Sequence, residues 1–224
     1  TVCGVRAGLA REGFPGTALI GFAGAPFTVA CYMVDGHGGG EFPATRRMAH
    51  AEPELFAALI ETLTEATIAY LLAQAEAGAE ALMLFDSWAG LLPPPLFARH
   101  VAAPTRRIAA ALAARCPGLP VIGFPRLAGA SLEGYAVGSD LAGIGVDTGT
   151  DLRFARGAVG LRIALQGNLD PLALLAGGAG LEHAVDAVLE AGRGGPFIFN
   201  LGHGILPATP VGHVAALVDR VRAA

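Results

Sequence analysis

The stretch Phe197-Ile198-Phe199-Asn200-Leu201-Gly202-His203-Gly204 joins an apolar run to a histidine that is held between two glycines. The run from Phe197 to Leu201 predicts a buried strand, and Thr209-Pro210 signals a helix that begins soon after it. Proteins of the α/β class present catalytic groups on strand-end turns of this kind. His203 is therefore a candidate functional residue, although this stretch alone is equally well explained by a loop histidine bonded to backbone.

Five further apolar runs predict strands, and patterns typical of helices separate them. These runs are residues 19–22, 81–85, 120–124, 143–146 and 163–166. Strands that are apolar throughout predict an α/β fold with a parallel sheet and helices on both faces. Polar and glycine-rich residues follow the strands and do not precede them, which is typical of a (β/α)8 TIM barrel. Since such a barrel has eight units, we expect one barrel domain over residues 1–224 that lacks the first one or two β/α units.

The composition favours a folded, heavily buried chain of a reducing compartment. Of the 224 residues, 53% are hydrophobic and 15% charged, and the net charge is −4. No basic tract suggests nucleic acid or an anionic membrane. Cys3, Cys31 and Cys116 show no spacing typical of metal ligands, so we expect free thiols, no metal and a cytoplasmic protein.

One uncharged segment resembles a membrane span, and another segment predicts a long helix. Residues 13–34 form an uncharged segment that is long enough for a membrane span. Pro15 and Pro26 interrupt it, so we reject the span. A long helix is predicted from about Pro53 to Ala77. Its apolar side is expected to hold Leu55, Leu59, Leu63, Ala66, Tyr70 and Ala73. We expect the Met and Phe residues of the strands to lie in the core.

The predicted strand ends gather side chains that could bind a carboxylated or phosphorylated ligand and could carry out acid–base chemistry. They are Tyr32, Asp86, Ser87, Arg126, Asp147, Asn168 and His203. Asp86 and Asp147 are alternatively explained as carboxylates that bind neighbouring backbone N–H groups. Asp151 and Asp170 are most simply helix N-caps. His50, His100, His183 and His213 lie on helical patterns and are expected to take no part in chemistry.

Four motifs in order resemble uroporphyrinogen decarboxylase, from about residue 19 to the C-terminus. They are Gly21-Phe22-Ala23-Gly24-Ala25-Pro26-Phe27-Thr28 with Tyr32-Met33-Val34, Phe85-Asp86-Ser87-Trp88-Ala89-Gly90, Leu165-Gln166-Gly167-Asn168-Leu169-Asp170-Pro171, and Asn200-Leu201-Gly202-His203-Gly204. No single motif carries the resemblance, but their shared order does.

The resemblance implies a (β/α)8 barrel, a homodimer, and a carboxy-lyase that needs no metal or organic cofactor. It implies removal of the four acetate carboxyl groups of uroporphyrinogen III as CO2, which gives coproporphyrinogen III in porphyrin synthesis for haem and chlorophyll. In that mechanism a pyrrole carbon is protonated, CO2 leaves, and the methylene is reprotonated. By motif position, the Tyr32 and Ser87 hydroxyl groups and the His203 ring match groups that bind the substrate carboxylates. Phe85 matches an aromatic residue of the pocket wall.

The chain departs from the family pattern in the groups that carry the central chemistry. The family has an arginine-rich segment and an aspartate beneath the pyrrole N–H groups, and no stretch here resembles either. Asp86 is not that aspartate, so the catalytic residues stay unassigned, and inactivity of this chain alone is an open alternative. Thr148 follows Asp147 where the family has an aromatic residue. Arg126 either pairs with a propionate of the substrate or is a surface charge, and both alternatives stay open.

Three other interpretations compete with this resemblance. A corrinoid-dependent methyltransferase of the same fold needs thiolate ligands for zinc, and no cysteine follows Cys116. A phosphate-binding isomerase or aldolase barrel could use Gly202-His203-Gly204 as an anion site, but the sequence has no lysine for a Schiff base. The third is a truncated, non-catalytic barrel that binds tetrapyrrole or persists only as a partner subunit.

Overall fold

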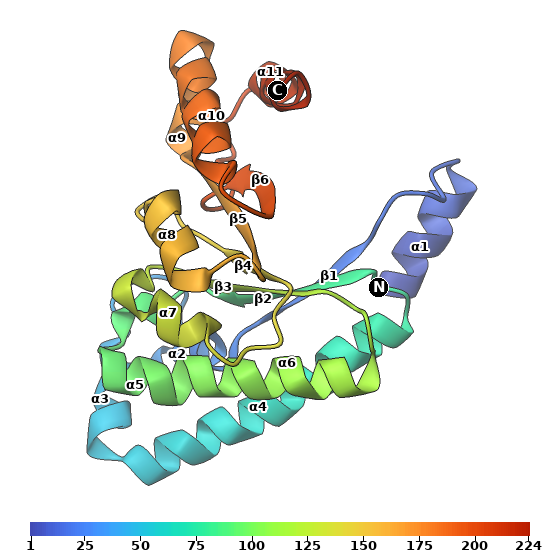
Figure 1. Ribbon diagram of the computed structural model, residues 1–224. Helices are drawn as coiled ribbons and strands as arrows, with labels where there is room; N and C mark the ends of the chain where they lie inside the picture. Colours follow the sequence, from blue (N-terminus) through green and yellow to red (C-terminus); the bar gives the residue numbers. More distant parts are fainter. The chain divides into compact units, whose positions relative to one another are not determined.

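The computed structural model describes residues 1–224 and contains two units, Thr1–Ala142 and Gly143–Ala224. They are called unit 1 and unit 2 (Figure 1). The expectation of one domain over residues 1–224 stays a prediction.

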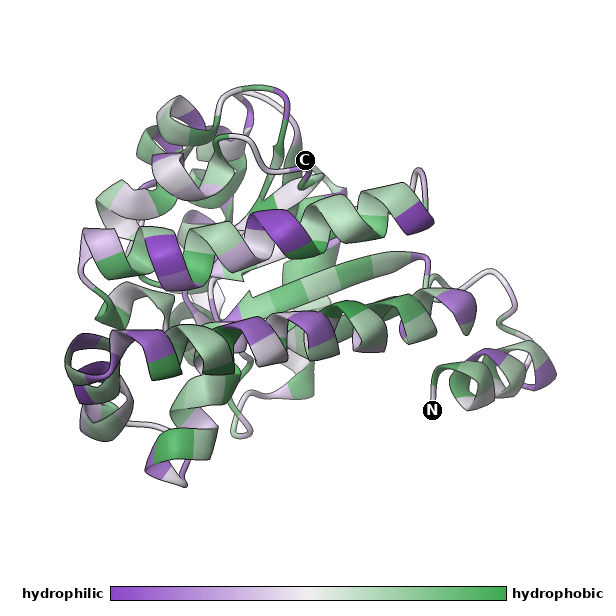
Figure 2. Cartoon of the chain, turned by 90° about the horizontal axis from the view of Figure 1, so that it is seen from below, coloured by the Kyte–Doolittle hydropathy of each residue, from purple (hydrophilic) through white to green (hydrophobic).

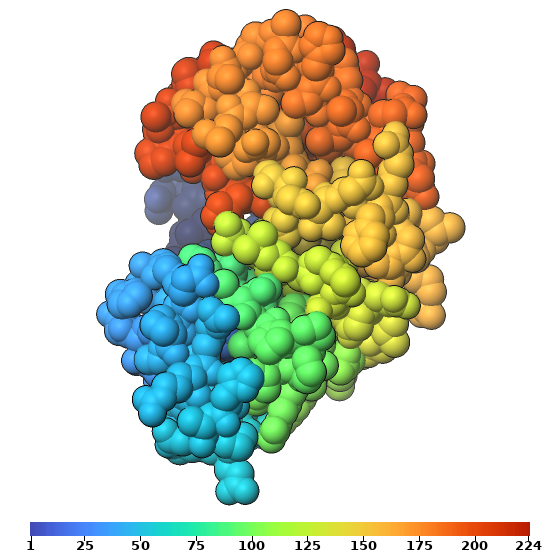
Figure 3. All heavy atoms as spheres, turned by 90° about the vertical axis from the view of Figure 1, so that its left-hand side faces the viewer, coloured from blue at the N-terminus to red at the C-terminus, as the bar shows by residue number.

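Unit 1 is built on three parallel strands with β2 in the middle. In chain order its elements are α1 (Val2–Arg11), β1 (Ile20–Gly24), α2 (Pro26–Asp35), α3 (Pro43–Ala51), α4 (Pro53–Glu76), β2 (Ala81–Asp86), η1 (Ala89–Leu91), α5 (Pro94–Phe97), the π-helical turn η2 (Ala98–Ala102), α6 (Ala103–Arg115), β3 (Val121–Pro125), η3 (Gly129–Ser131) and α7 (Leu132–Ala136). Leu82 of β2 pairs with Gly21 of β1 and with Val121 of β3. In Figure 3 the blue-to-cyan atoms of α2–α4 lie beside the green atoms of α5–α6, in agreement with the contacts between α4 and α6.

Unit 2 repeats the same arrangement around β5. Its elements are β4 (Gly143–Gly145), α8 (Leu152–Val159), β5 (Ala164–Leu169), α9 (Pro171–Ala176), α10 (Gly178–Gly192), β6 (Phe197–Leu201) and α11 (Val211–Arg222). β5 pairs in parallel with both β4 and β6. Its core is a cluster of Leu169, Leu174, Leu181, Val185 and Leu217.

The six strands lie where the sequence predicted them, and a helix follows each one. The prediction of an α/β fold is therefore confirmed. The two predicted N-caps are also confirmed: the Asp151 carboxylate accepts a hydrogen bond from the Phe154 N–H at 2.8 Å, and the Asp170 carboxylate accepts one from the Leu172 N–H at 2.8 Å.

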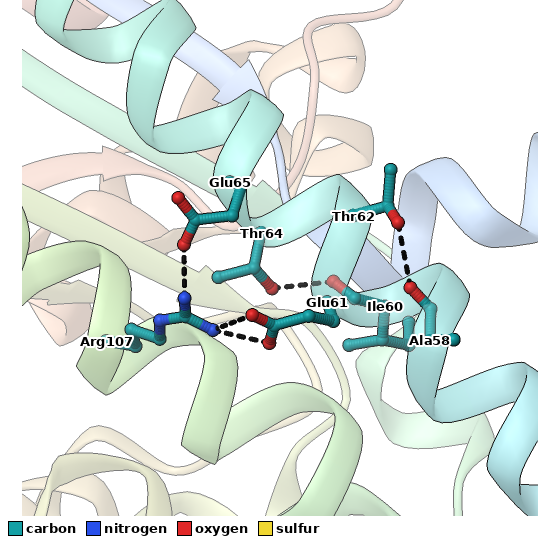
Figure 4. A network of polar contacts seen from close by, with 7 residues as sticks. All are labelled: Ala58, Ile60, Glu61, Thr62, Thr64, Glu65 and Arg107. Atoms are coloured by element: carbon teal, nitrogen blue, oxygen red, sulfur yellow. Dashed lines mark hydrogen bonds and ion pairs between the residues drawn. The ribbon is translucent and has the colours of Figure 1, made fainter.

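The buried face of α4 is not the apolar side that the sequence predicted. Leu55 and Tyr70 are 56% and 58% exposed. The buried side chains are instead Phe56, Ile60, Thr64, Thr67, Leu71 and Gln74. Polar residues can occupy this face because their groups are paired. The Thr64 hydroxyl donates to the Ile60 carbonyl at 2.7 Å (Figure 4).

Ion pairs join α4 to α6. Arg107 of α6 points toward Glu61 and Glu65 of α4 and pairs with both carboxylates (Figure 4). By length and composition α4 alone could cross a membrane. Figure 2 shows hydrophilic turns between hydrophobic ones along the long helices of unit 1. Since α4 packs against α2, α3 and α6, its length and composition do not indicate a membrane span.

A side chain of α4 also forms hydrogen bonds with the backbone of one residue of β1. The Gln74 carboxamide accepts a hydrogen bond from the Phe22 N–H at 3.0 Å and donates one to the Phe22 carbonyl at 2.9 Å. Both backbone groups of Phe22 are thus paired with a helix side chain. The Phe22 ring itself is 61% exposed, so the expectation that every strand Phe lies in the core is wrong for this residue.

Candidate functional site

Tyr32 and Ser87, two of the three predicted substrate-binding residues, come together in unit 1. Tyr32 lies on α2, and Ser87 follows β2 directly. Because β1 and β2 are parallel, the helix after β1 begins beside the end of β2. The Trp88 indole Nε1–H donates a hydrogen bond of 2.9 Å to the Tyr32 hydroxyl. The Tyr32 hydroxyl therefore lies next to the turn that carries Ser87.

Thr28, which lies one helical turn before Tyr32 on α2, also holds the chain that follows β2. Residues four apart lie on one face of a helix, so Thr28 and Tyr32 both face the end of β2. The Thr28 hydroxyl donates to the Asp86 carboxylate at 2.6 Å and accepts from the Trp88 backbone N–H at 3.3 Å. Two side chains of α2 thus hold the backbone and the indole of Trp88.

Asp86 is buried, with 1% of its surface exposed, and its Oδ2 atom has no hydrogen-bond partner. Removal of the carboxyl group from water raises its pKa to about 7, although the hydrogen bonds from Thr28 act in the opposite direction. A ligand cannot reach this carboxyl group, so Asp86 supports the turn from inside. Its partner is Thr28, and the alternative that it only binds neighbouring backbone N–H groups was too narrow.

An aromatic ring packs against the Trp88 indole. Phe42, which is fully buried, has its ring centroid 4.9 Å from that of Trp88 and 6.0 Å from that of Tyr32. The His37 ring stacks on Phe42 at 5.9 Å. Through Phe42, the segment that joins α2 to α3 contacts both Tyr32 and Trp88.

Arg126 completes this group from the end of β3. Its guanidinium carbon lies 5.8 Å from the centre of the Trp88 ring, and Nη1 donates to the Ser87 carbonyl at 3.4 Å. Gly90 makes this approach possible, because a Cβ at that position would lie 2.1 Å from the Leu127 carbonyl oxygen. We call Tyr32, Ser87, Trp88 and Arg126 the Trp88 site. Hydroxyl and guanidinium groups are suited to bind carboxylates.

A row of phenylalanines crosses the three strands of unit 1. The Phe85 ring of β2 contacts Phe22 of β1 edge-on at 5.9 Å and Phe124 of β3 edge-on at 6.1 Å. Phe85 was the predicted pocket aromatic, and the structure adds its two neighbours. Their shared face could have been inferred from the alternation of side chains along each strand.

His203, the third predicted binding residue, lies in unit 2 just after β6 and is exposed. The preceding Gly202 donates its N–H to the Leu169 carbonyl at 2.8 Å. A Cβ on Gly202 would lie 2.6 Å from the Thr148 nitrogen, so only glycine fits. This close contact fixes the turn that presents His203.

Asp147 and Asn168 build the neighbouring turn of unit 2. The Asp147 carboxylate accepts from the Gly149 N–H at 2.9 Å and from the Thr150 hydroxyl at 3.3 Å. The Asn168 amide donates to the Asp147 carbonyl at 2.9 Å and to the Thr150 carbonyl at 2.7 Å. These bonds support the structural alternative for Asp147.

The structure contains no group of three or more His, Cys, Asp or Glu side chains that could hold a metal ion. The cysteines Cys3, Cys31 and Cys116 are free thiols. Thr28 and Trp88 lie within the motifs that resemble the family, and Thr28 is also four residues from Tyr32, but neither was predicted as part of the site. Phe42 lies in none of these motifs and was not predicted.

Comparisons with known proteins show the family to which the chain is similar. Residues 6–224 match the family model described as uroporphyrinogen decarboxylase. Proteins named uroporphyrinogen decarboxylase are 60% identical over 99% of this chain in Granulibacter bethesdensis, 56% over 91% in Gluconacetobacter diazotrophicus and 55% over 99% in Acidiphilium cryptum. The chain covers 64%, 58% and 61% of these relatives, which is less than two thirds of their length.

A solved structure described as a methyltransferase from Methanosarcina mazei matches 99% of this chain with a TM-score of 0.79 and 22% identity, and the match covers 62% of that chain. At this identity the likeness shows the fold alone. Together with the family match, it supports the prediction of a partial (β/α)8 barrel.

Proposed function

Because the chain belongs to the uroporphyrinogen decarboxylase family, we propose that the protein takes part in the decarboxylation of uroporphyrinogen III to coproporphyrinogen III. It is then a carboxy-lyase that releases the four acetate carboxyl groups as CO2 in porphyrin synthesis. The observation that carries this proposal is the Trp88 site, where the Tyr32 hydroxyl and the Arg126 guanidinium lie against one indole and Ser87 directly precedes it in the chain.

The substrate and the site have complementary chemistry. Uroporphyrinogen carries acetate and propionate carboxylates around an apolar macrocycle of four pyrroles joined by methylene bridges. Hydrogen bonds from hydroxyl and guanidinium groups to carboxylates are the strong, charge-assisted kind. The row of Phe22, Phe85 and Phe124 offers an aromatic face in the same unit. Net charge is −4, so local groups rather than bulk attraction must bind the anionic substrate.

We assign binding roles to four side chains. Tyr32 and Ser87 donate hydroxyl hydrogen bonds to substrate carboxylates, and Arg126 pairs with a propionate. His203 contacts a carboxylate as well, which the glycine-framed turn after β6 supports. No proton-transfer role is assigned in this chain. Asp86 in particular is too deeply buried to touch a ligand.

Localisation, oligomeric state, partners and cofactors are part of the same proposal. The protein acts in the cytoplasm as a homodimer, without nucleic acid, membrane, metal or organic cofactor. A non-catalytic chain that binds tetrapyrrole is the second candidate, because the Asp86 carboxyl group beside the Trp88 site is buried. A corrinoid-dependent methyltransferase has less support, since the likeness to a methyltransferase structure extends only to the fold.

Turnover of uroporphyrinogen III tests the proposal, with the porphyrins separated after oxidation. Tyr32→Phe and His203→Ala should each reduce kcat/KM by an amount equivalent to about 1–3 kcal/mol, the value of a hydrogen bond to a charged group. Tyr70→Phe on α4 and His50→Ala on α3 are matched controls that should leave turnover unchanged. Wild-type rates in Tyr32→Phe and His203→Ala would remove both residues from the site. Binding of uroporphyrin without turnover would favour the non-catalytic candidate.

A further inference from the structure

We propose that Trp88 is a positioning residue that fixes the direction of the Tyr32 hydroxyl, so that Tyr32 acts as a hydrogen-bond donor toward a carboxylate. The inference rests on the proposed function, because it takes Tyr32 to contact a carboxylate of the substrate. It adds the reason why this tyrosine selects that group.

The hydrogen bond between the two side chains has a fixed direction. An indole N–H can only donate, so the Tyr32 oxygen must be the acceptor of the 2.9 Å bond from Trp88 Nε1. A hydroxyl group has one hydrogen of its own to donate. With its oxygen engaged by the indole, the Tyr32 hydroxyl directs that hydrogen elsewhere. Because Tyr32 is 41% exposed, a ligand can reach it.

The partner that suits this hydrogen is an acceptor. An ionised carboxylate only accepts hydrogen bonds, whereas an amide N–H or an ammonium group only donates them. The Trp88 bond therefore makes Tyr32 selective for an acceptor and unfavourable to a donor. Without it, the hydroxyl could turn either way and would spend part of its time with its oxygen facing the ligand.

The indole can impose this direction because it is itself held on several sides. The Trp88 backbone N–H donates to the Thr28 hydroxyl, which donates in turn to the buried carboxyl group of Asp86. The Phe42 ring packs against the indole at 4.9 Å, and the Arg126 guanidinium lies over it at 5.8 Å. A donor held in this way does not have to be ordered when a ligand binds.

The first test observes the bond without a ligand. Trp88 is the only tryptophan of the sequence, so an amide-correlated NMR spectrum of the 224-residue chain contains one indole N–H signal. Tyr32→Phe should move this signal upfield and speed its exchange with water, because the acceptor is lost. Tyr70→Phe should leave it in place. An indole signal that does not respond to Tyr32→Phe overturns the inference.

The second test is a double-mutant cycle on the dissociation constant of uroporphyrin III, the stable oxidised ring system, followed by the fluorescence of the porphyrin. Tyr32→Phe should weaken binding about tenfold, and Trp88→Phe by about three- to tenfold. The double variant should bind no more than about twofold more weakly than Tyr32→Phe alone, because Trp88 acts through Tyr32. Multiplying effects overturn the inference and leave the proposed function standing. Failure of the wild-type chain to bind overturns both.

A third variant separates the indole N–H from the indole shape. Replacement of Trp88 by 3-benzothienylalanine keeps the bicyclic ring and puts sulfur in place of the N–H donor. Its fold can be checked by circular dichroism and by an unchanged urea midpoint. This variant should lose as much affinity for uroporphyrin as Trp88→Phe does. Wild-type affinity would show that only the shape of the ring matters and would overturn the inference.

Discussion

A buried hydrogen bond of 2.6 Å joins the Thr28 hydroxyl to the Asp86 carboxyl group across 58 positions of the sequence. It ties the start of α2 to the end of β2, and the same hydroxyl holds the Trp88 backbone. The turn that carries Ser87 and Trp88 therefore depends on a contact that no ligand touches.

Replacing Thr28 by valine tests that dependence, since valine keeps the shape and removes the hydroxyl. Asp86 would lose the partner of Oδ1 in a site where Oδ2 already has none. Thr28→Val should lower the free energy of unfolding by about 1–3 kcal/mol. Thr62→Val is the control, because Thr62 is exposed and its hydroxyl bonds only within α4, so its effect should stay within about 0.5 kcal/mol. Urea unfolding of both variants measures the difference, and equal midpoints would refute the dependence.

Two buried groups of unit 1 should give opposite pH dependence of stability. Burial raises the pKa of Asp86 to about 7, so its contribution is fully present below the ordinary value of 3.8 and is lost as the pH rises through 7. Burial, with help from Arg99, lowers the pKa of His100 to about 4, so its contribution is present above the ordinary 6.5 and is lost as the pH falls through 4.

Single variants separate these contributions. Relative to wild type, Asp86→Asn should gain stability as the pH rises from about 4 to about 7, by an amount on the order of 2–4 kcal/mol. His100→Gln should gain relative stability as the pH falls from about 6.5 to about 4, by a similar amount. Urea unfolding at several pH values across this range measures both. A difference between variant and wild type that does not change with pH would contradict the corresponding assignment.

Gly90 should be intolerant of a side chain. It donates its N–H to the Arg126 carbonyl at 3.0 Å, and a Cβ would lie 2.1 Å from the Leu127 carbonyl oxygen. Gly90→Ala should therefore cost about 1–3 kcal/mol of stability and displace Arg126, which weakens uroporphyrin binding. Gly134→Ala, in the open surface of α7, should be neutral or stabilising by up to about 1 kcal/mol. Thermal unfolding and porphyrin titration of the two variants give the comparison; similar behaviour would count against the close contact.

Asn168 should matter to unit 2 through its amide group. Asn168→Ala removes the bonds to the Asp147 and Thr150 carbonyls and should cost about 1–3 kcal/mol. Asn200→Ala removes only the bond to the adjacent Leu201 N–H and should cost no more than about 0.5 kcal/mol. Hydrogen exchange of the amides of residues 147–150 reports the loosened turn directly. Unchanged protection in Asn168→Ala would show that other contacts hold it.

The strands could be predicted because each is a short apolar run with a clear end, and the motifs around them carried the family. The buried face of α4 could not be predicted in this way. Thr64 and Gln74 look like surface residues in a sequence, and only the structure shows that a helix carbonyl and the Phe22 backbone satisfy them. Polarity is a poor guide to burial where the polar group finds a partner.

The candidate site was predictable in part for a similar reason. Tyr32 and Ser87 were found by motif, but the role of Trp88 depends on one side-chain bond between residues 56 positions apart. Nothing in the local sequence of either residue indicates that contact. The sequence does not decide between a ligand partner and a surface charge for Arg126, and the structure places its guanidinium over the Trp88 ring.

The pairing of Gln74 with Phe22 has a consequence for contacts between molecules. An unpaired strand at the margin of a sheet is a template onto which an extended segment of another chain can add, and such addition leads to aggregation. At Phe22, the backbone N–H and carbonyl that would pair with the incoming segment are already hydrogen-bonded to the Gln74 carboxamide. A single helix residue thus interrupts the template in the middle of β1, and Gln74→Leu would restore it.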